Sequence, residues 1–180
     1  GGKDTVALYL ENHPQSRFFS GKGLILGGSH SPSALNAHAH CGDLSAVLLQ
    51  NLNPLVNLIR VPDKQIILMD EWENKIKAIV QSTCHENVNS LSGVPSWMLV
   101  LIKAILAYTG KEYLTDVWPN LEVFFHGGIS FTPYRDEYKA LIPSEKMHYM
   151  ETYNASEGFF GIQNDPQDHS LLLMLDYDIF

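Results

Sequence analysis

Two hydrophobic periods alternate along this chain, and the alternation limits the folds that it can adopt. Short apolar runs that end in glycine or proline are followed by longer segments in which apolar side chains recur every three or four residues. The first pattern is typical of buried strands and the second of amphipathic helices. Because alternating strands and helices build a sheet covered by helices, the sequence predicts an α/β fold with a mixed or parallel sheet and flanking helices.

Turn and capping residues indicate where the predicted elements begin and end. Helices are expected over residues 5–12, 43–51 with Asp43 as the cap, from Asp70 with Asp70 and Glu73 as a capping box, 95–109 before Gly110, and from Thr132 onward. Strands are expected over residues 23–26, 88–91, 121–125, 146–152 and 171–180. Residues 31–42 have no stable period and are predicted to form a loop.

The helix between Pro95 and Gly110 is so apolar that most of it is expected to be buried. Its predicted inner stripe is Trp97, Leu101, Ile105 and Tyr108, with Met98 and Ile102 beside it. The preceding helix is predicted to bury Trp72, Ile76, Ile79 and Val80. The predicted core therefore includes Trp97, Leu101, Ile105, Leu121, Val123 and Phe125.

Composition excludes several classes of function. At 180 residues the chain can form one domain with a sizeable core, and a single domain is expected over residues 1–180. The net charge of −8 argues against a nucleic-acid partner, which requires clustered Lys and Arg. No apolar run approaches the ~20 residues that span a bilayer, so no membrane partner is expected. Cys41 and Cys84 form no disulfide framework, which favours free thiols and a cytoplasmic location.

Both ends of the chain favour a piece of a longer protein. The opening Gly1-Gly2 has no signal-peptide core after it and is consistent with an expression scar. The apolar run over residues 171–180 stops inside a predicted strand or just after it. We therefore expect the chain to be a fragment of a larger domain.

Residues 152–158, with the sequence TYNASEG, contain the strongest candidate site. Tyr153 offers a flat ring for adenine, Ser156 a hydroxyl for a phosphate oxygen, and Glu157 a hard oxygen ligand for Mg²⁺. The preceding predicted strand would deliver them to the carboxyl edge of an open α/β sheet, where ligands bind. From the residues alone, a polar turn with a solvated Glu157 remains the alternative.

This run resembles the second nucleotide-binding motif of the auxin-responsive acyl-acid amido synthetases, the Gretchen Hagen three family of the adenylate-forming superfamily. The family pattern of Tyr, two small residues, Ser and Glu is matched by Tyr153, Ser156 and Glu157. Asn154 and Ala155 depart mildly from it. The resemblance covers residues 118–164 and includes Trp118-Pro119-Asn120 before a strand, Gly127-Gly128 after it, a helix from about Tyr134, and Phe160-Gly161-Ile162-Gln163-Asn164.

The resemblance implies a ligase that uses ATP and Mg²⁺ to adenylate a small carboxylic acid and then transfers the acyl group to an amino acid. It implies that Tyr153 packs against adenine, Ser156 contacts phosphate and Glu157 holds Mg²⁺, with catalysis through positioning and charge neutralisation. Gly127 and Gly128 would let the backbone approach the nucleotide or acyl group, although a strand-ending turn is their other reading. Tyr153, Ser156, Glu157 and Gly127 are therefore expected to share one accessible cleft.

Other parts of the family's site have no counterpart in the sequence. A Ser/Thr/Gly-rich phosphate loop with a following Lys should precede this segment, and Gly27-Gly28-Ser29 is too short to replace it. The Asp that binds ribose and the catalytic Lys of the C-terminal domain should lie after Phe180. We expect the isolated chain to bind nucleotide weakly and to be inactive.

Alternative interpretations remain for several polar groups. A zinc site would use the cluster His38, His40, Cys41, Cys84 and His85, whose spacing fits no common zinc module. His126 could contact substrate or be a packed histidine at a strand end. The carboxylates of residues 70–73 fit a charged helix start, and His30, Ser31 and Asp43 lack the elbow of a hydrolase. The main functional alternative is a non-catalytic α/β ligand-binding or interaction module.

Overall fold

The computed structural model describes residues 2–27, 30–32, 40–42, 58–155, 158–164 and 170–173. A seven-stranded sheet contains β1 (Lys22–Leu26), β4 (Arg60–Val61), β5 (Val88–Gly93), β6 (Val123–Gly127), β7 (His148–Ala155), β8 (Gly158–Gln163) and β9 (Leu171–Leu173). A two-stranded sheet pairs β2 (His30–Pro32) with β3 (His40–Gly42). The helices are α1 (Gly2–Asn12), α3 (Lys64–Ile67), α4 (Trp72–Thr83), α5 (Pro95–Thr109), α6 (Leu114–Val117) and α7 (Arg135–Leu141).

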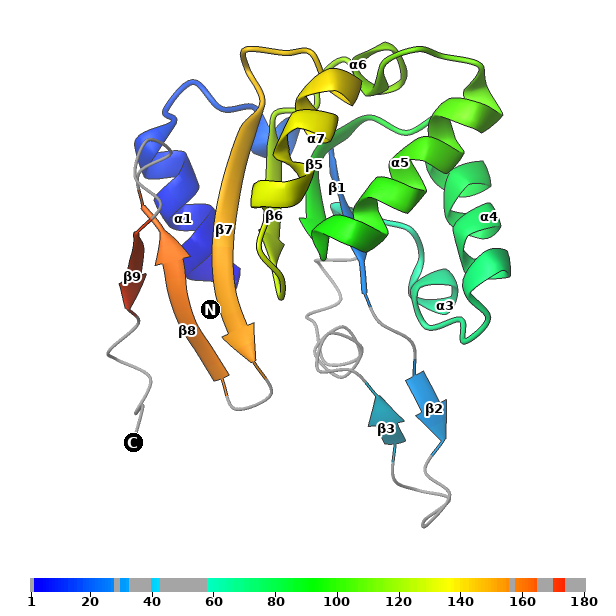
Figure 1. Cartoon of the computed structure of the whole chain (residues 1–180), viewed down its shortest axis with the longest axis horizontal. Coiled ribbons are helices and arrows are strands. Elements are labelled where there is room, and N and C mark those ends of the chain that lie inside the picture. The colour runs from blue at the N-terminus through cyan, green and yellow to red at the C-terminus, as the bar shows by residue number, and fades with distance from the viewer. Residues whose placement is uncertain are drawn as a thin grey trace.

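The larger sheet is parallel over most of its width. Its strand order is β4-β1-β5-β6-β7-β8-β9, and the pairs from β4 to β7 are parallel. The last two pairs, β7 with β8 and β8 with β9, are antiparallel. The carboxyl ends of the parallel strands therefore meet along one edge of the sheet, which is the lower edge in Figure 1.

Side chains of β6 alternate between two hydrophobic cores on opposite faces of the sheet. Phe124 belongs to the larger core, on the face covered by α4, α5 and α7 (Figure 1). Val123 and Phe125 lie in a smaller core with Tyr9 of α1 and Met150 of β7. Neighbouring residues of a strand face opposite sides of the sheet, which is why β6 contributes to both cores. The helices α4, α5 and α7 cover one face, and α1 covers the other. The predicted α/β fold, a mixed sheet with flanking helices, is confirmed.

The helix α5 begins and ends as predicted, but its buried face is offset by one residue from the predicted stripe. Pro95 lies in its first turn and Gly110 caps it with a φ of +67°. The buried side chains are Met98, Leu99, Leu101, Ile102, Ile105 and Leu106. Leu101 and Ile105 of the predicted stripe are buried, but Trp97 is 38% exposed and Tyr108 is 58% exposed, so the predicted core position of Trp97 is wrong and the stripe does not reach Tyr108. A helix that lies on one face of a sheet buries only its inner side, even when its outer side is also apolar.

The start of α4 also differs from its prediction by one residue. Glu71, and not Asp70, is the N-cap, and its carboxylate accepts hydrogen bonds from the backbone N–H groups of Glu73 (3.2 Å) and Asn74 (2.7 Å). Trp72 is 36% exposed, and its ring lies 5.9 Å from that of Trp97. The two tryptophans therefore pack against each other on the outer side of the helices and not in the core.

Other boundaries shift by a few residues. The strand predicted over residues 121–125 is β6, which begins at Val123, and the strand predicted over 146–152 is β7, which continues to Ala155. The predicted loop over residues 31–42 is wrong at both ends, because β2 and β3 pair there through backbone hydrogen bonds that require no apolar period. The helix predicted over residues 43–51 lies outside the described residues.

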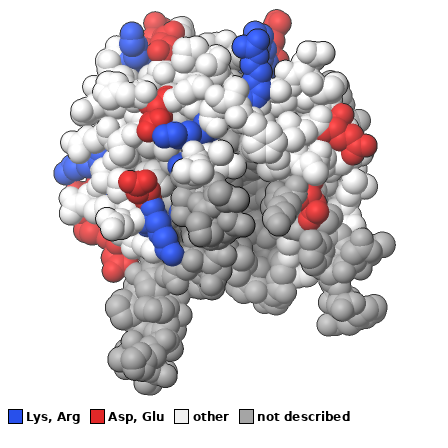
Figure 2. All heavy atoms as spheres, turned by 180° about the vertical axis from the view of Figure 1, so that it is seen from behind, with Lys and Arg blue, Asp and Glu red and all other residues white. Residues whose placement is uncertain are grey.

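Charged side chains of both signs are mixed on the face shown in Figure 2, where Lys and Arg lie close to Asp and Glu. Ion pairs of the described residues include Lys22 with Glu86 (2.9 Å) and Lys103 of α5 with Glu137 of α7 (2.6 Å). Within the part of the chain that the structure describes, no helix has the length and apolar character needed to cross a membrane.

Candidate functional site

The predicted site residues that the structure describes lie at the carboxyl edge of the sheet. Gly127 is the last residue of β6 and pairs with Thr152 of the neighbouring parallel strand β7. Tyr153 follows Thr152 directly, so the glycine turn and the tyrosine occupy adjacent strand ends. Gly127 and Tyr153, two of the four residues that were predicted to share a cleft, therefore lie on neighbouring strands. Ligands of open α/β sheets bind at this edge.

Close packing explains why Gly127 carries no side chain. A Cβ added there would lie 2.3 Å from the Thr152 carbonyl oxygen and 3.0 Å from Thr152 Oγ1. The Thr152 hydroxyl in turn donates a hydrogen bond to the His126 carbonyl (3.1 Å). Gly128 has a φ of +83°, a backbone conformation that other residues rarely adopt. The glycine pair therefore lets β6 turn immediately against the end of β7.

Replacing Gly127 with alanine is expected to lower the free energy of unfolding by about 1–3 kcal/mol, because the new methyl group would overlap the Thr152 carbonyl. Chemical denaturation measures the change. Gly110→Ala is a useful comparison, since an added Cβ there has no heavy atom within 4 Å and the cost, on the order of 1 kcal/mol, comes from backbone conformation alone. Gly127→Val should lower the free energy of unfolding further. If neither the alanine nor the valine variant loses stability, the close contact between Gly127 and Thr152 is contradicted.

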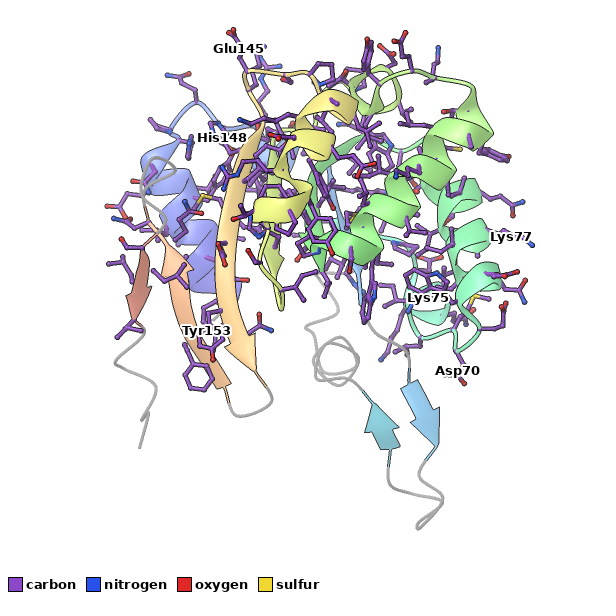
Figure 3. The ribbon with its side chains drawn as sticks, in the orientation of Figure 1. Asp70, Lys75, Lys77, Glu145, His148 and Tyr153 are labelled. Carbon is purple, nitrogen blue, oxygen red and sulfur yellow. The ribbon has the colours of Figure 1, made fainter. Side chains whose placement is uncertain are left out.

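Tyr153 presents its ring at the end of β7. The side chain is 52% exposed, and Figure 3 shows it at the carboxyl edge. Its ring centroid lies 5.4 Å from that of Phe160 on the antiparallel strand β8. An exposed aromatic ring held by a second ring is suited to stack on a flat ligand.

The polar motif belongs in part to a strand and not to a loop after a strand. Tyr153, Asn154 and Ala155 are the last residues of β7, and Ala155 pairs with Gly158 of β8. Ser156 and Glu157 lie outside the described residues. Their predicted contacts with phosphate and Mg²⁺ therefore stay predictions.

His126 is a packed histidine, the second of the two readings made from the sequence. It is 2% exposed, and its ring stacks on Phe131 with 4.2 Å between centroids. Burial, and then the charge of Arg135, lower its pKa from 6.5 to about 3. Its Nδ1 is buried without a hydrogen-bond partner in the described structure. His126 is therefore a neutral imidazole that packs against aromatic rings and does not face solvent.

The low pKa of His126 predicts a loss of stability in acid. As the pH falls below about 6.5, the unfolded chain binds a proton at this histidine and the folded chain does not, so the free energy of unfolding falls, by on the order of 2 kcal/mol at about pH 5. His126→Leu should remove this part of the fall. Denaturation series from pH 7 to pH 5 test it, with His85→Leu at an exposed position as the control. Equal slopes in wild type and His126→Leu would show that His126 is not buried neutral.

A buried lysine, which sequence reasoning missed, lies at the same edge. Lys75 is 1% exposed and donates a hydrogen bond to the carbonyl of Gly27 (2.8 Å), the residue after β1. Figure 3 shows Lys75 on the inner side of α4 and Lys77 pointing away from the sheet. The spacing could have revealed it, because Lys75 lies four residues before Ile79 and so shares the apolar face of the helix. Its hydrogen bond to Gly27 joins the inner side of α4 to the carboxyl end of β1.

The described residues contain no group of three His, Cys, Asp or Glu side chains arranged to hold a metal ion. The side chains of His38, His40 and Cys41 lie outside the described part, so the zinc alternative is not tested. Cys84 is a buried free thiol. The hydrolase alternative of His30, Ser31 and Asp43 also concerns side chains that are not described.

An open groove of about 700 Å³ lies at the opposite, amino edge of the sheet. Its lining comes from the end of α1 and the segments before β6 and β7, and includes Tyr9, His13, Ser16, Arg17, Glu122, Glu145, Lys146 and His148. Figure 3 shows Glu145 and His148 at the end of the sheet opposite Tyr153. None of the predicted site residues lines this groove.

Glu122 is the centre of a hydrogen-bond cluster in that groove. Glu122 accepts hydrogen bonds from the hydroxyls of Tyr9 (3.3 Å) and Ser16 and from the backbone N–H of Arg17 (3.0 Å). Burial and the nearby His13 lower the pKa of His148, while Glu122 raises it. These hydrogen bonds, and the ring contact of His13 with His148, connect α1 and the segment after it to the starts of β6 and β7. Stabilising the packing of α1 on the sheet is sufficient to explain them.

Comparison with known proteins identifies the fold and the family. The family model described as the GH3 family N-terminal domain matches residues 1–147. The chain belongs to the GH3 family. The resemblance seen in the sequence at residues 118–164 is thereby confirmed at the level of the family.

A solved structure of a GH3.15 acyl acid amido synthetase has the same fold as this GH3 chain, with a TM-score of 0.70 at 14% sequence identity. The match covers 93% of this chain and 40% of the other, so the GH3 chain spans well under half the length of that relative. A comparison with curated proteins gave no match.

Proposed function

We propose that this GH3 chain belongs to an acyl-acid amido synthetase that consumes ATP, and that the carboxyl edge of its sheet binds the nucleotide. The observation that carries the proposal is the pairing of Gly127 with Thr152, which places the glycine turn beside Tyr153. The family match and the amido synthetase fold support the same reaction class. Because the chain spans 40% of that structure, the activity is proposed for the full-length protein.

The reaction proceeds in two steps. A carboxylate oxygen of the acid attacks the α-phosphorus of ATP, the bond to the bridging oxygen breaks, and pyrophosphate leaves with that electron pair. An amino-acid amine then attacks the acyl carbon of the adenylate, loses a proton and expels AMP to leave an amide. Neither step forms a bond to the protein, so the protein contributes positioning and charge neutralisation.

Each predicted site residue has one task in this scheme. Tyr153 stacks on adenine, Ser156 donates a hydrogen bond to a phosphate oxygen, and the turn at Gly127 and Gly128 lets main chain approach the ligand. Glu157 supplies the kind of hard carboxylate oxygen that Mg²⁺ prefers. Bound there, Mg²⁺ would neutralise negative charge on the phosphates.

Exchange of radioactive pyrophosphate into ATP tests the first step. The full-length protein should catalyse exchange in the presence of some member of a panel of small carboxylic acids, and hydroxylamine or an amino acid should then trap the acyl group. The isolated 180-residue chain should give no exchange. Exchange that is absent for every acid, with nucleotide binding also absent, would favour the non-catalytic module instead.

A further inference from the structure

A β-bulge in β8 brings Phe160 against Tyr153. Tyr153 pairs with Gly161, and the next residue of β7, Asn154, pairs with Phe159. One step along β7 therefore spans two residues of β8, and Phe160 is the extra residue. Bulges redirect side chains and are frequent beside binding sites.

The redirection decides which face of the sheet Phe160 occupies. In a regular ladder Phe160 would face away from Tyr153, because successive side chains of a strand alternate. Instead the two ring centroids lie 5.4 Å apart, with 38° between the ring planes. Phe160 is half-buried, and half of Tyr153 remains exposed. The bulge thus supports the tyrosine ring and leaves part of it free for a ligand.

We propose that Phe160 is a positioning residue of the nucleotide site, which holds the Tyr153 ring at the angle that receives the base. This inference rests on the proposed adenine role of Tyr153. An exposed tyrosine without a neighbouring ring samples several rotamers, and restricting them before binding removes an entropic cost from binding. Phe160 acts through Tyr153 and needs no contact with the nucleotide.

Phe159 is the matched control. It has the same side chain and lies one residue away, but it pairs directly with Asn154 and no ring contact joins it to Tyr153 among those described. A loss of aromatic volume in β8 would affect both variants, whereas a loss of support for Tyr153 would affect only the Phe160 variant.

Binding of Mg-ATP and of inorganic tripolyphosphate to the full-length protein gives the test. Phe160→Ala should raise the Kd for Mg-ATP about five-fold, the size expected for loss of one aromatic pair, and should leave the Kd for tripolyphosphate, which has no base, unchanged. Phe160→Tyr keeps a ring at this position and should bind Mg-ATP as tightly as the wild type. Phe159→Ala should change neither Kd. If Phe160→Ala does not fold, Phe160→Leu keeps the apolar volume without the ring and should show the same selective loss.

A double-mutant cycle separates positioning from direct contact. In a Tyr153→Ala background, Phe160→Ala should cause no further loss of ATP affinity, because its effect passes through the tyrosine. An undiminished loss in that background, or equal losses for ATP and tripolyphosphate, would overturn the positioning role. If Tyr153→Ala itself leaves ATP binding unchanged, the proposed adenine role of Tyr153 fails and not only this inference.

Discussion

Replacing Trp118 with alanine is expected to lower the free energy of unfolding by about 3–5 kcal/mol, because a large aromatic side chain leaves a cavity that the core cannot refill. Trp118 is 1% exposed and belongs to the larger core. Its indole N–H also donates a hydrogen bond to the carbonyl of Thr83 (3.1 Å), which joins the end of α4 to the segment before β6. Chemical denaturation of the variant measures the loss.

Trp97→Ala is the matched control for this prediction. The same substitution is made on a helix of the same layer, but Trp97 is 38% exposed and packs on Trp72 at the outer side. The expected loss is smaller, about 1–2 kcal/mol, because more than a third of the side chain already lies in water. Similar losses in the two variants would contradict the placement of α5.

Replacing Glu157 with glutamine is expected to slow adenylation by the full-length protein by on the order of 10²–10³, the scale of losing one preorganised electrostatic contact. The substitution keeps the shape of the side chain and removes the charge that is proposed to hold Mg²⁺. Raised Mg²⁺ should restore part of the rate. Pyrophosphate exchange at several Mg²⁺ concentrations measures both effects.

Glu145→Gln provides the control for position 157. Glu145 is exposed at the opposite edge of the sheet, beside the amino-edge groove, so its charge should not influence a metal at the carboxyl edge (Figure 3). Full exchange activity in Glu157→Gln would remove the metal role. An equal decrease in both variants would show that the loss reflects net charge and not one site.

Local signals were sufficient to predict the layered α/β fold. Apolar runs followed by glycine located β1, β5 and β6, and Pro95 with Gly110 bounded α5 correctly. The prediction failed where two neighbouring side chains have similar hydrophobicity, because only tertiary contacts determine which of the two is buried. Trp97 and Met98 differ by one position, and the sheet beneath α5 buries Met98.

Antiparallel pairing between polar segments that lie close in sequence accounts for the other differences. The motif that includes Tyr153 was predicted to form a turn, yet β8 extends β7 to Ala155 by antiparallel pairing. Such pairing depends on backbone hydrogen bonds, which polar residues make as well as apolar ones. The same reason explains β2 and β3, where no apolar period predicted a strand.

The candidate site could be predicted only in part. The structure shows Gly127 and Tyr153 on adjacent strand ends, as the order of the predicted strands implied, and their roles in binding remain predictions. Lys75 and Phe160 were not assigned roles, because burial of a lysine and a bulge in a strand depend on the assembled fold. Ser156 and Glu157 lie outside the described residues, and their roles remain predictions.

Photo-crosslinking with 8-azido-ATP tests the location of the nucleotide site most directly. The full-length protein would be labelled in the presence of Mg²⁺, digested and mapped by mass spectrometry, with excess ATP as the competitor. The account predicts competable label within residues 152–160, at the carboxyl edge of the sheet. Competable label instead at the amino-edge groove, within residues 9–17, 119–122 or 144–148, would contradict it.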